Sequence, residues 1–403
     1  MQKRWWLCYA TDFQTLMFPC FACSRILGIF PYKLNVSTFG ISKLYYILST
    51  IAICICCVIN FALIYHIAKS HINFGNTIWN FHAITYYILT SFVVIITHFL
   101  SAPRMRLLQT ILEVSSKLPT ESYQKLSKWI HVKDISCNII RVVQFTMHLS
   151  KVLNIEDTFY VILVGVLTLY FALLVLQIIM LYLNCVCVLT ACFKKINDSL
   201  VQMQTFVIND TKLRVSNVIW HTQRKQYFLL EIRILKKQHL MISDAVRLLN
   251  MVFSLQLLAT IIMSFLIITF ELYFYAIRWQ NGVFIGMDWR LLDVFLTSMI
   301  YNVFKIILIV WACETGKNQV RAIGTAIHDL LNSTNDEEIK CELQLFSLQV
   351  LHCKNTFSVK FISIDASLLV VVSKQLFVIN ITISVTYCFY FTFRWWAILA
   401  RTY

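Results

Sequence analysis

The sequence has little of what loops and linkers are made from. It contains 8 glycines and 4 prolines in 403 residues, so no flexible linker or low-complexity segment separates independent domains. Charged residues are scarce at 14% of the chain, whereas apolar residues reach 59%. A soluble protein of this length would not bury so much apolar surface, and the mean hydropathy of +0.69 is typical of a polytopic membrane protein.

Several chemical signatures are also absent from the sequence. It has no nucleophile elbow, phosphate-binding loop or zinc motif, and the histidines lack metal-ligand spacing. The sequence therefore predicts no enzyme, no metal site and no cofactor. None of the 14 cysteines lies in the segments expected outside the cell, 69–77, 150–158, 277–290 and 394–403, which excludes an extracellular disulfide framework.

Seven apolar stretches predict an all-α membrane protein with seven transmembrane helices. Six are clear, at residues 44–68, 78–100, 159–193, 248–275, 291–313 and 366–393. The remaining one, 135–149, contains Arg141, Gln144 and His148, so it resembles an amphipathic surface helix as much as a span. The stretch 159–193 is too long for a bilayer, and we expect it to continue as a helix into the cytosol.

The basic residues indicate the orientation of these spans. With seven crossings and a cytosolic N-terminus, 26 of the 35 Lys and Arg residues fall in cytosolic segments and 6 fall outside. We therefore expect the N-terminus in the cytosol and the C-terminus outside the cell. The formal net charge of +15 is then a signature of topology and requires no nucleic-acid partner.

Polar residues return to one face of the last predicted helix. Ser373, Asn380, Ser384, Tyr387 and Phe391 follow one another at helical spacing. Lipid cannot satisfy the polar atoms of such a stripe, so the stripe must face protein or water. Packing inside a helix bundle and lining of a water-filled pore both meet this requirement.

Other stretches carry a family resemblance. They are CSRILGIFPYKL (23–34), HLMISDAVRLLNMVFSLQLLATIIMSFLIIT (239–269), and ETGKNQVRAIGTAIHDLLN and ELQLFSLQVLHCKNTFSVKFISIDASLLVVV after the sixth span. Together with the topology, they resemble the insect gustatory receptors. Segment 23–34 is expected to form an amphipathic run that ends at Pro31 and lies along the inner membrane surface.

The C-terminal signature of that family is half present. It consists of Thr-Tyr, five mostly apolar residues and Gln-Phe. Thr386 and Tyr387 match its start, whereas Phe393 and Arg394 stand at the Gln-Phe positions. Cys388 follows the Thr-Tyr pair, where sugar receptors of the family commonly carry an acidic residue. This departure favours a ligand other than a sugar.

The resemblance implies a ligand-gated cation channel in the plasma membrane of gustatory neurons, opened by a small-molecule tastant. Related subunits would form a tetramer around a pore lined by Asn380, Ser384, Tyr387 and Phe391. It divides the chain into a cytosolic N-terminal segment (1–43), a six-helix ligand-binding region (44–313), a cytosolic anchor (314–363) and the pore helix with a short tail (364–403). The alternatives are a receptor that signals through G proteins, which requires an external N-terminus, and an odorant-type channel subunit.

A ligand pocket is expected in the outer halves of the other spans. Aromatic side chains with a few convergent polar groups suit a small molecule, although aromatic belts also gather at membrane interfaces without binding anything. Lys305 and Lys374 are expected to snorkel or to pair with an acid such as Asp365. The predicted ligand-binding residues are His82, Tyr86, His148, Glu271 and Phe274.

Overall fold

The computed structural model describes residues 9–34, 38–69, 77–152, 158–212, 218–280, 289–353, 355–359, 362–363 and 374. Within these ranges the chain forms nine helices, as the prediction of an all-α protein requires, and two short antiparallel hairpins that were not predicted. The hairpins pair β1 (Tyr32–Leu34) with β2 (Phe39–Ile41) and β3 (Ser358–Val359) with β4 (Ile362–Ser363). The helices are α1 (Phe13–Ile26), α2 (Lys43–Ala68), α3 (Thr77–Phe99), α4 (Ser101–Ser115), α5 (Thr120–Val152), α6 (Thr158–Lys212), α7 (Val218–Gln280), α8 (Trp289–Ser333) and α9 (Glu337–His352).

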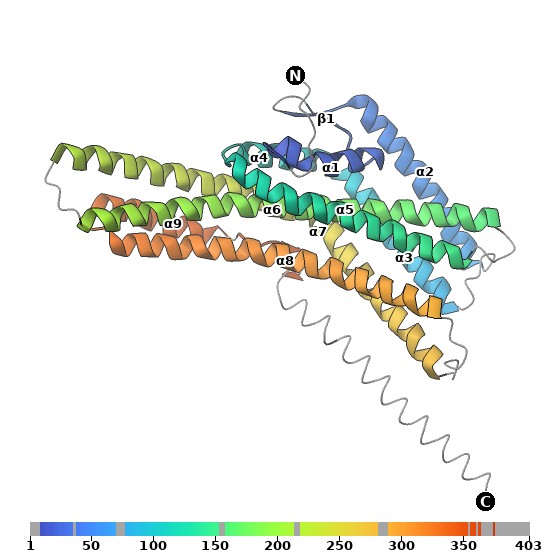
Figure 1. The fold of residues 1–403 in the computed structure, drawn as a ribbon. Helices are drawn as coiled ribbons and strands as arrows, with labels where there is room; N and C mark the ends of the chain where they lie inside the picture. Colours follow the sequence, from blue (N-terminus) through green and yellow to red (C-terminus); the bar gives the residue numbers. More distant parts are fainter. Residues whose placement is uncertain are drawn as a thin grey trace, which may run out of the picture.

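Three very long helices form the body of the molecule (Figure 1). α6, α7 and α8 contain 55, 63 and 45 residues. At about 1.5 Å per residue, α7 is roughly 95 Å long, about three times the thickness of the hydrocarbon core of a bilayer. The prediction that the stretch 159–193 continues as a helix is confirmed, because α6 extends without a break to Lys212.

Five segments of the described helices are long and apolar enough to cross a membrane. They are Lys43–Ala68, Asn80–Phe99, Ile162–Ile208, Lys225–Phe274 and Leu296–Ser333. Each contains or overlaps one of the six clear spans predicted from the sequence. The sixth of those spans, 366–393, lies outside the described residues except for Lys374.

Helix α5 contains the weakly predicted span and is not among these five segments. Its outward face nevertheless carries apolar side chains, with Val132 and Ile139 exposed by 56% and 58%. Its inward face buries Lys133, Asp134 and Gln144. This arrangement is the reverse of a surface helix in a soluble protein, which turns its apolar stripe to the core and its charges to water.

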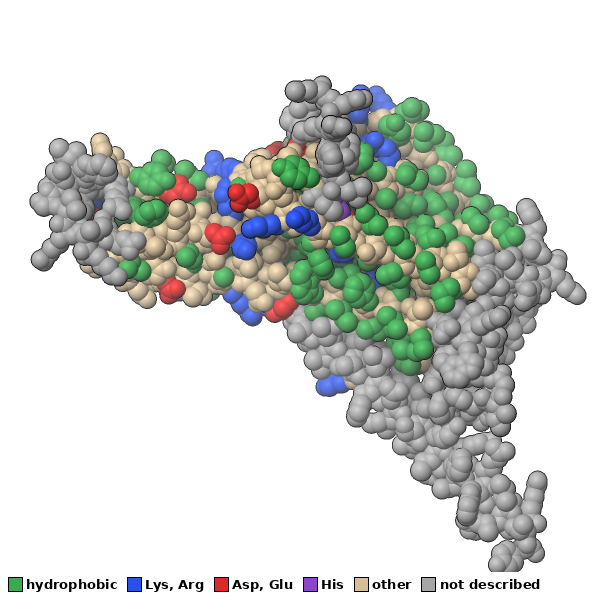
Figure 2. Space-filling view, in the orientation of Figure 1, with side chains coloured by type: hydrophobic (Ala, Val, Ile, Leu, Met, Phe, Trp, Pro, Cys, Tyr) green, Lys and Arg blue, Asp and Glu red, His purple; other side chains and the backbone are tan. Residues whose placement is uncertain are grey.

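The surface separates into two regions of different chemistry. Figure 2 shows hydrophobic side chains crowded over one end of the molecule, whereas Lys, Arg, Asp and Glu gather toward the other. Helix α2 contributes strongly to the apolar region, since Leu44, Ile47, Ile55 and Val58 are all exposed by more than half. An apolar surface of this extent marks contact with a membrane or another protein.

The expectation of one amphipathic run from Cys23 to Pro31 is wrong. α1 begins at Phe13, capped by Asp12, whose carboxylate accepts a hydrogen bond of 2.9 Å from the Thr15 backbone. The helix ends at Ile26, and Gly28 follows with φ +75°, a conformation that side chains with a β-carbon rarely adopt. The chain then turns into the β1–β2 hairpin. α1 packs against α5 and α6 and buries Phe13, Leu16, Met17, Cys20, Phe21 and Ser24.

Candidate functional site

A small cavity lies between the apolar portions of α3 and α7. The empty space between the side chains is about 170 Å³ with its open surroundings included, and the enclosed cavity itself is only about 10 Å³. The lining residues of each helix are three or four positions apart, so they lie on one face of α3 and on one face of α7. The cavity contains two of the predicted ligand-binding residues, and its lining is His82, Thr85, Tyr86, Leu89, Met263, Leu266 and Ile267.

Two more predicted residues extend the same face of α7. Glu271 follows Ile267 by four residues, and Phe274 follows Glu271 by three. The neighbouring Phe270 ring lies 5.0 Å from the His82 ring, which brings α3 and α7 together at this level. The structure thus gathers His82, Tyr86, Glu271 and Phe274 on two adjoining helix faces. The side chain of His148, the fifth predicted residue, lies outside the described part of the chain.

Glu271 is a largely buried acid among apolar neighbours. Its Oε2 atom is shielded from solvent and has no hydrogen-bond partner among the described residues. The side chain of Ser298 interacts with the carboxylate, and two cations, Arg141 and Lys305, act on it electrostatically. A buried acceptor without a donor typically costs about 1–3 kcal/mol, so this carboxylate is a group whose position requires an explanation.

The position of Lys305 contradicts the expectation that it snorkels. Its side chain is 5% exposed, and its ammonium group donates a 3.0 Å hydrogen bond to Oδ1 of Asn302 on the same helix. The ammonium also lies 5.6 Å from the centre of the Tyr301 ring, within the range of a cation–π interaction. Tertiary packing, not the distance to an interface, holds this lysine inside the bundle.

Arg141 completes the cluster from the α5 side. Its guanidinium donates a 2.7 Å hydrogen bond to Oε1 of Gln144 and lies 5.2 Å from the centre of the Tyr301 ring. The sequence analysis used Arg141 only as evidence that residues 135–149 are a poor span. It did not predict that Arg141 interacts electrostatically with Glu271. The signal was available, since an ionisable group within an apolar stretch marks a functional position by default. Arg141, Glu271 and Lys305 are called the charge cluster below.

A second buried ionic group joins α5 to α6. Lys133 Nζ lies 2.6 Å from Oδ1 of Asp134, and both side chains are at most 6% exposed. Asn184 of α6 bridges the pair, because its Oδ1 accepts from Lys133 at 2.9 Å and its Nδ2 donates to Oδ2 of Asp134 at 2.7 Å. Such a pair is stable in a low-dielectric interior only while every member is present.

Residues 355–357 dock onto α7 and α8. The Asn355 amide contacts the buried His239 ring at 3.2 Å, and the carbonyl of Thr356 accepts a 2.7 Å hydrogen bond from Asn250. The Phe357 ring lies against Gly316 of α8 so closely that a β-carbon at Gly316 would overlap it. We call residues 355–357 the docked linker.

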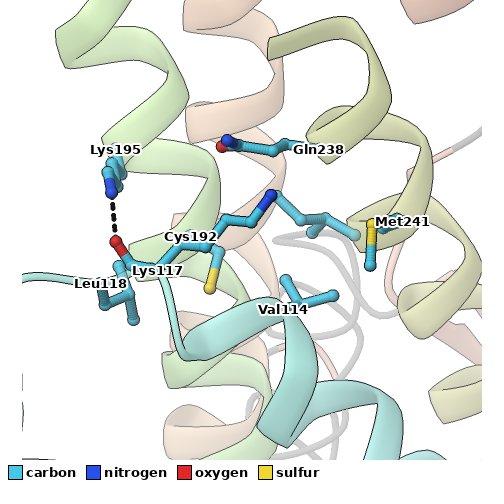
Figure 3. Close-up of a pocket in the computed structure, with 8 residues that line it drawn as sticks. Val114, Lys117, Leu118, Cys192, Lys195, Gln238 and Met241 are labelled. Atoms are coloured by element: carbon cyan, nitrogen blue, oxygen red, sulfur yellow. Dashed lines mark hydrogen bonds between the residues drawn. The ribbon is translucent and has the colours of Figure 1, made fainter. Parts of the chain in front are cut away.

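Another hollow lies between the end of α4 and the helices α6 and α7 (Figure 3), with an enclosed volume of about 20 Å³. Lys195 lies at one side of it and donates a hydrogen bond to the carbonyl of Lys117, just beyond the last turn of α4. This bond joins α6 to the turn that follows α4. The hollow is lined by Val114, Lys117, Leu118, Cys192, Lys195, Gln238, Met241 and Ile242.

The predicted pore and signature residues fall outside the described residues. This is true of the stripe Asn380, Ser384, Tyr387 and Phe391, and of the signature residues Thr386 and Phe393. No group of three or more potential metal ligands occurs in the described ranges.

Comparisons with known proteins agree on one class. The family model described as 7tm chemosensory receptor matches residues 17–372. A putative gustatory receptor 28b of Drosophila melanogaster is 31% identical over 147 residues, which are 34% of this chain and 30% of that protein. The match therefore spans about a third of the length of this curated relative.

Solved structures share the fold at low sequence identity. The insect olfactory receptor OR5 from Machilis hrabei has a TM-score of 0.70 and 11% identity, covering 93% of this chain and 97% of that one. The same receptor in complex with eugenol gives the same TM-score and identity, with 98% of its chain covered.

Proposed function

The chain belongs to the 7tm chemosensory receptor family, and from this premise we propose that it is a ligand-gated, non-selective cation channel opened by a small-molecule tastant. It would act in the plasma membrane of gustatory sensory neurons, with a ligand other than a sugar. The observation that carries the proposal is the charge cluster beside the α3–α7 cavity. Burying charged groups inside an apolar helix bundle costs free energy, so such groups typically mark positions that bind a ligand or take part in a conformational change.

The cavity has the composition of a small-molecule site. Aromatic and aliphatic walls surround few polar groups, which is the usual chemistry of such sites. A related receptor fold has been solved with eugenol bound, which supports a ligand of similar scale for this chain. His148 remains a proposed ligand contact together with His82, Tyr86, Glu271 and Phe274.

Seven crossings are supported by the two faces of α5. Its exposed apolar face, with Val132 and Ile139, suits lipid, and its buried polar face meets α6 and α8. Counting α5, six described helices cross the membrane and the last apolar stretch, 366–393, adds the seventh. The N-terminus is then cytosolic and the C-terminus external, in agreement with the bias of the basic residues.

A tetramer is supported by an unpaired face of α9. Leu345, Leu348 and Leu351 lie three residues apart and are exposed by 48%, 52% and 77%. In the proposed topology α9 is cytosolic, so lipid cannot cover these leucines, whereas a neighbouring subunit can. The anchor 314–363 would join the subunits, and the stripe from Asn380 to Phe391 would line the pore between them.

Two single helices connect the cavity with the docked linker. α7 carries Glu271 as well as Asn250, and α8 carries Lys305 as well as Gly316. The docked linker lies shortly before the last apolar stretch in the sequence. A shift of α7 or α8 on ligand binding would therefore move the docked linker directly.

Substituting Gly316 tests this coupling. We expect Gly316→Ala to displace the Phe357 ring, because the added methyl group overlaps it, and to reduce the ligand-evoked current per surface receptor to a small fraction. Gly324→Ala is the matched control on the same helix, since an added β-carbon there meets nothing within 4 Å. Replacing a helical glycine by alanine typically stabilises by up to ~1 kcal/mol, so the control should express normally. Equal currents from both variants would rule out the coupling role.

The proposal is tested by recording ligand-evoked current from excised patches without nucleotide. An active tastant should open the channel under these conditions, and Glu271→Gln should raise the half-maximal concentration about tenfold, equal to ~1.4 kcal/mol, with ion selectivity unchanged. Glu113→Gln is the control, because Glu113 is exposed on α4 and accepts a hydrogen bond of 3.1 Å from Gln109. No current without nucleotide, with receptor present at the surface, would reject the channel and favour signalling through G proteins.

A further inference from the structure

The buried imidazole ring of His239 joins α7 to α9 and to the docked linker. It contacts the side-chain amide of Gln349 in α9 at 3.1 Å and that of Asn355 in the docked linker at 3.2 Å. We infer that His239 is the positioning residue of the docked linker, and that a proton taken up from the cytosol by its ring releases the linker. The effect on current rests on the proposed function, whereas the release itself does not.

The hydrogen bonds around the ring define its protonation state. The amide nitrogen of Gln349 donates a 2.9 Å hydrogen bond to the carbonyl of Lys236, so it is an NH2 group with one further hydrogen for Nδ1 of His239. Nδ1 is therefore an acceptor, and the hydrogen of the neutral ring is carried by Nε2, which faces the Asn355 amide. A proton on Nδ1 would turn this acceptor into a donor and set two donors against each other.

The walls around the ring are apolar and supply no negative partner for an imidazolium. Phe193 of α6 and Phe346 of α9 pack against it, with ring centres 5.9 and 5.7 Å away. Both phenylalanines are fully buried, so water does not solvate the ring from these sides. A charged ring in such a site loses hydration without gaining a counter-ion, and docking therefore favours the neutral form.

Charged groups on the surrounding helices are engaged with other partners. Glu342 of α9 binds Arg233 at 3.0 Å and Lys236 at 2.9 Å, which ties its carboxylate to α7. The docked linker itself contains no titratable side chain. The other charged or titratable groups on these elements are Lys237, exposed on α7; His352, exposed on α9; Lys194, exposed on α6; Lys195, bound to the carbonyl of Lys117; and Glu314, paired with Lys317 on α8.

The sign of the pH dependence follows from the two states of the ring. His239 precedes the predicted span 248–275 in the basic, cytosolic part of α7, and burial there lowers the pKa of His239 to about 4. When the docked linker and the last turn of α9 leave the ring, it meets water, where a histidine has a pKa of ~6.5. Docking is then favoured above that pH and weakens as the pH falls. Between pH 7.4 and 6.0 the ratio of docked to released receptor should fall roughly fourfold.

Hydrogen exchange of purified receptor in nanodiscs tests the release directly. We expect the protection of backbone amides in the docked linker to fall roughly fourfold between pH 7.4 and 6.0, after correction for the intrinsic pH dependence of exchange. His239→Gln removes the titrating ring and should abolish this fall, whereas His328→Gln, at an exposed histidine of α8, should preserve it. Constant protection in the parent receptor, or an equal fall in His239→Gln, would overturn the inference.

Asn355→Asp should reverse the sign of the effect, and it tests the inference even if the His239→Gln receptor does not fold. The substitution places a carboxylate of similar shape against Nε2 of His239, which favours the imidazolium and raises the pKa of His239. With a raised pKa in the docked state, docking is strongest at low pH and weakens as the pH rises. Protection should then be higher at pH 6.0 than at pH 7.4. A fall like that of the parent receptor would contradict the role of His239.

Inside-out patches show whether the released linker affects gating. We expect the ligand-evoked current to decrease severalfold when the bath on the cytosolic side is changed from pH 7.4 to 6.0, with the pipette held at pH 7.4. The current of His239→Gln should stay constant over this range, and that of His328→Gln should decrease as in the parent receptor. A parent current that is independent of cytosolic pH would overturn the action of protons on the receptor.

The two measurements also separate this inference from the channel proposal. Protection that depends on pH through His239, without ligand-evoked current at any pH, would support the role of His239 and contradict the channel. Ligand-evoked current with constant protection of the docked linker would support the channel and contradict the role of His239.

Discussion

Asp134→Asn is expected to cause most of the receptor to be lost from the cell surface. The substitution leaves the Lys133 ammonium buried beside Asn184 without a negative partner. Removing one member of a buried ion pair typically costs about 3–5 kcal/mol, because the remaining charge stays out of water. Lys133→Met should be similarly damaging. Surface labelling and the temperature of aggregation in detergent measure the effect.

The double variant distinguishes charge from packing. Lys133→Met with Asp134→Leu removes both charges and should recover much of the surface expression, since apolar replacement of a whole buried pair is often neutral. The control is Lys340→Gln, which breaks an exposed pair with Glu337 at 3.0 Å. Exposed pairs contribute about 0–1 kcal/mol, so this variant should behave as the parent receptor. A damaging Lys340→Gln, or a double variant worse than both singles, would contradict this account.

The second large effect is expected in the last apolar stretch. If Asn380, Ser384, Tyr387 and Phe391 line the pore, cysteines at these positions should react with small water-soluble thiol reagents and change the current. Phe391→Ala should widen a constriction that blocks conduction by dewetting, and leak current without ligand should rise. Patch-clamp recording before and after reagent measures both results.

Two neighbouring positions provide the control for the pore stripe. Thr382 and Val385 lie about half a helical turn from it, so cysteines there should react much more slowly. The native Cys388 requires prior replacement, because it lies near the stripe and would itself react. Equal reactivity around the helix, or no reactivity, would show that the stripe packs inside a subunit and that the pore lies elsewhere.

The sequence by itself determined the class of the protein and the position of its long helices. Five predicted spans match described helices because a bilayer imposes one requirement on every crossing, a long apolar run whose backbone bonds are satisfied internally. Glu271 was selected as a candidate for a related reason, since an ionisable residue in such a run is exceptional and can be recognised without knowledge of its neighbours.

The tertiary structure decided which residues meet. From hydropathy alone, Lys305 was expected to snorkel to the membrane interface and residues 23–34 were expected to lie along the membrane surface. Arg141 made the stretch 135–149 a poor candidate for a span. The fold instead buries Lys305, brings Arg141 near Glu271 and places β1 after the turn at Gly28. Periodicity records which face of a helix is apolar, but the identity of the helix opposite depends on contacts between residues far apart in the chain. The contact of Phe357 with Gly316 exists only because α8 and the docked linker pack together.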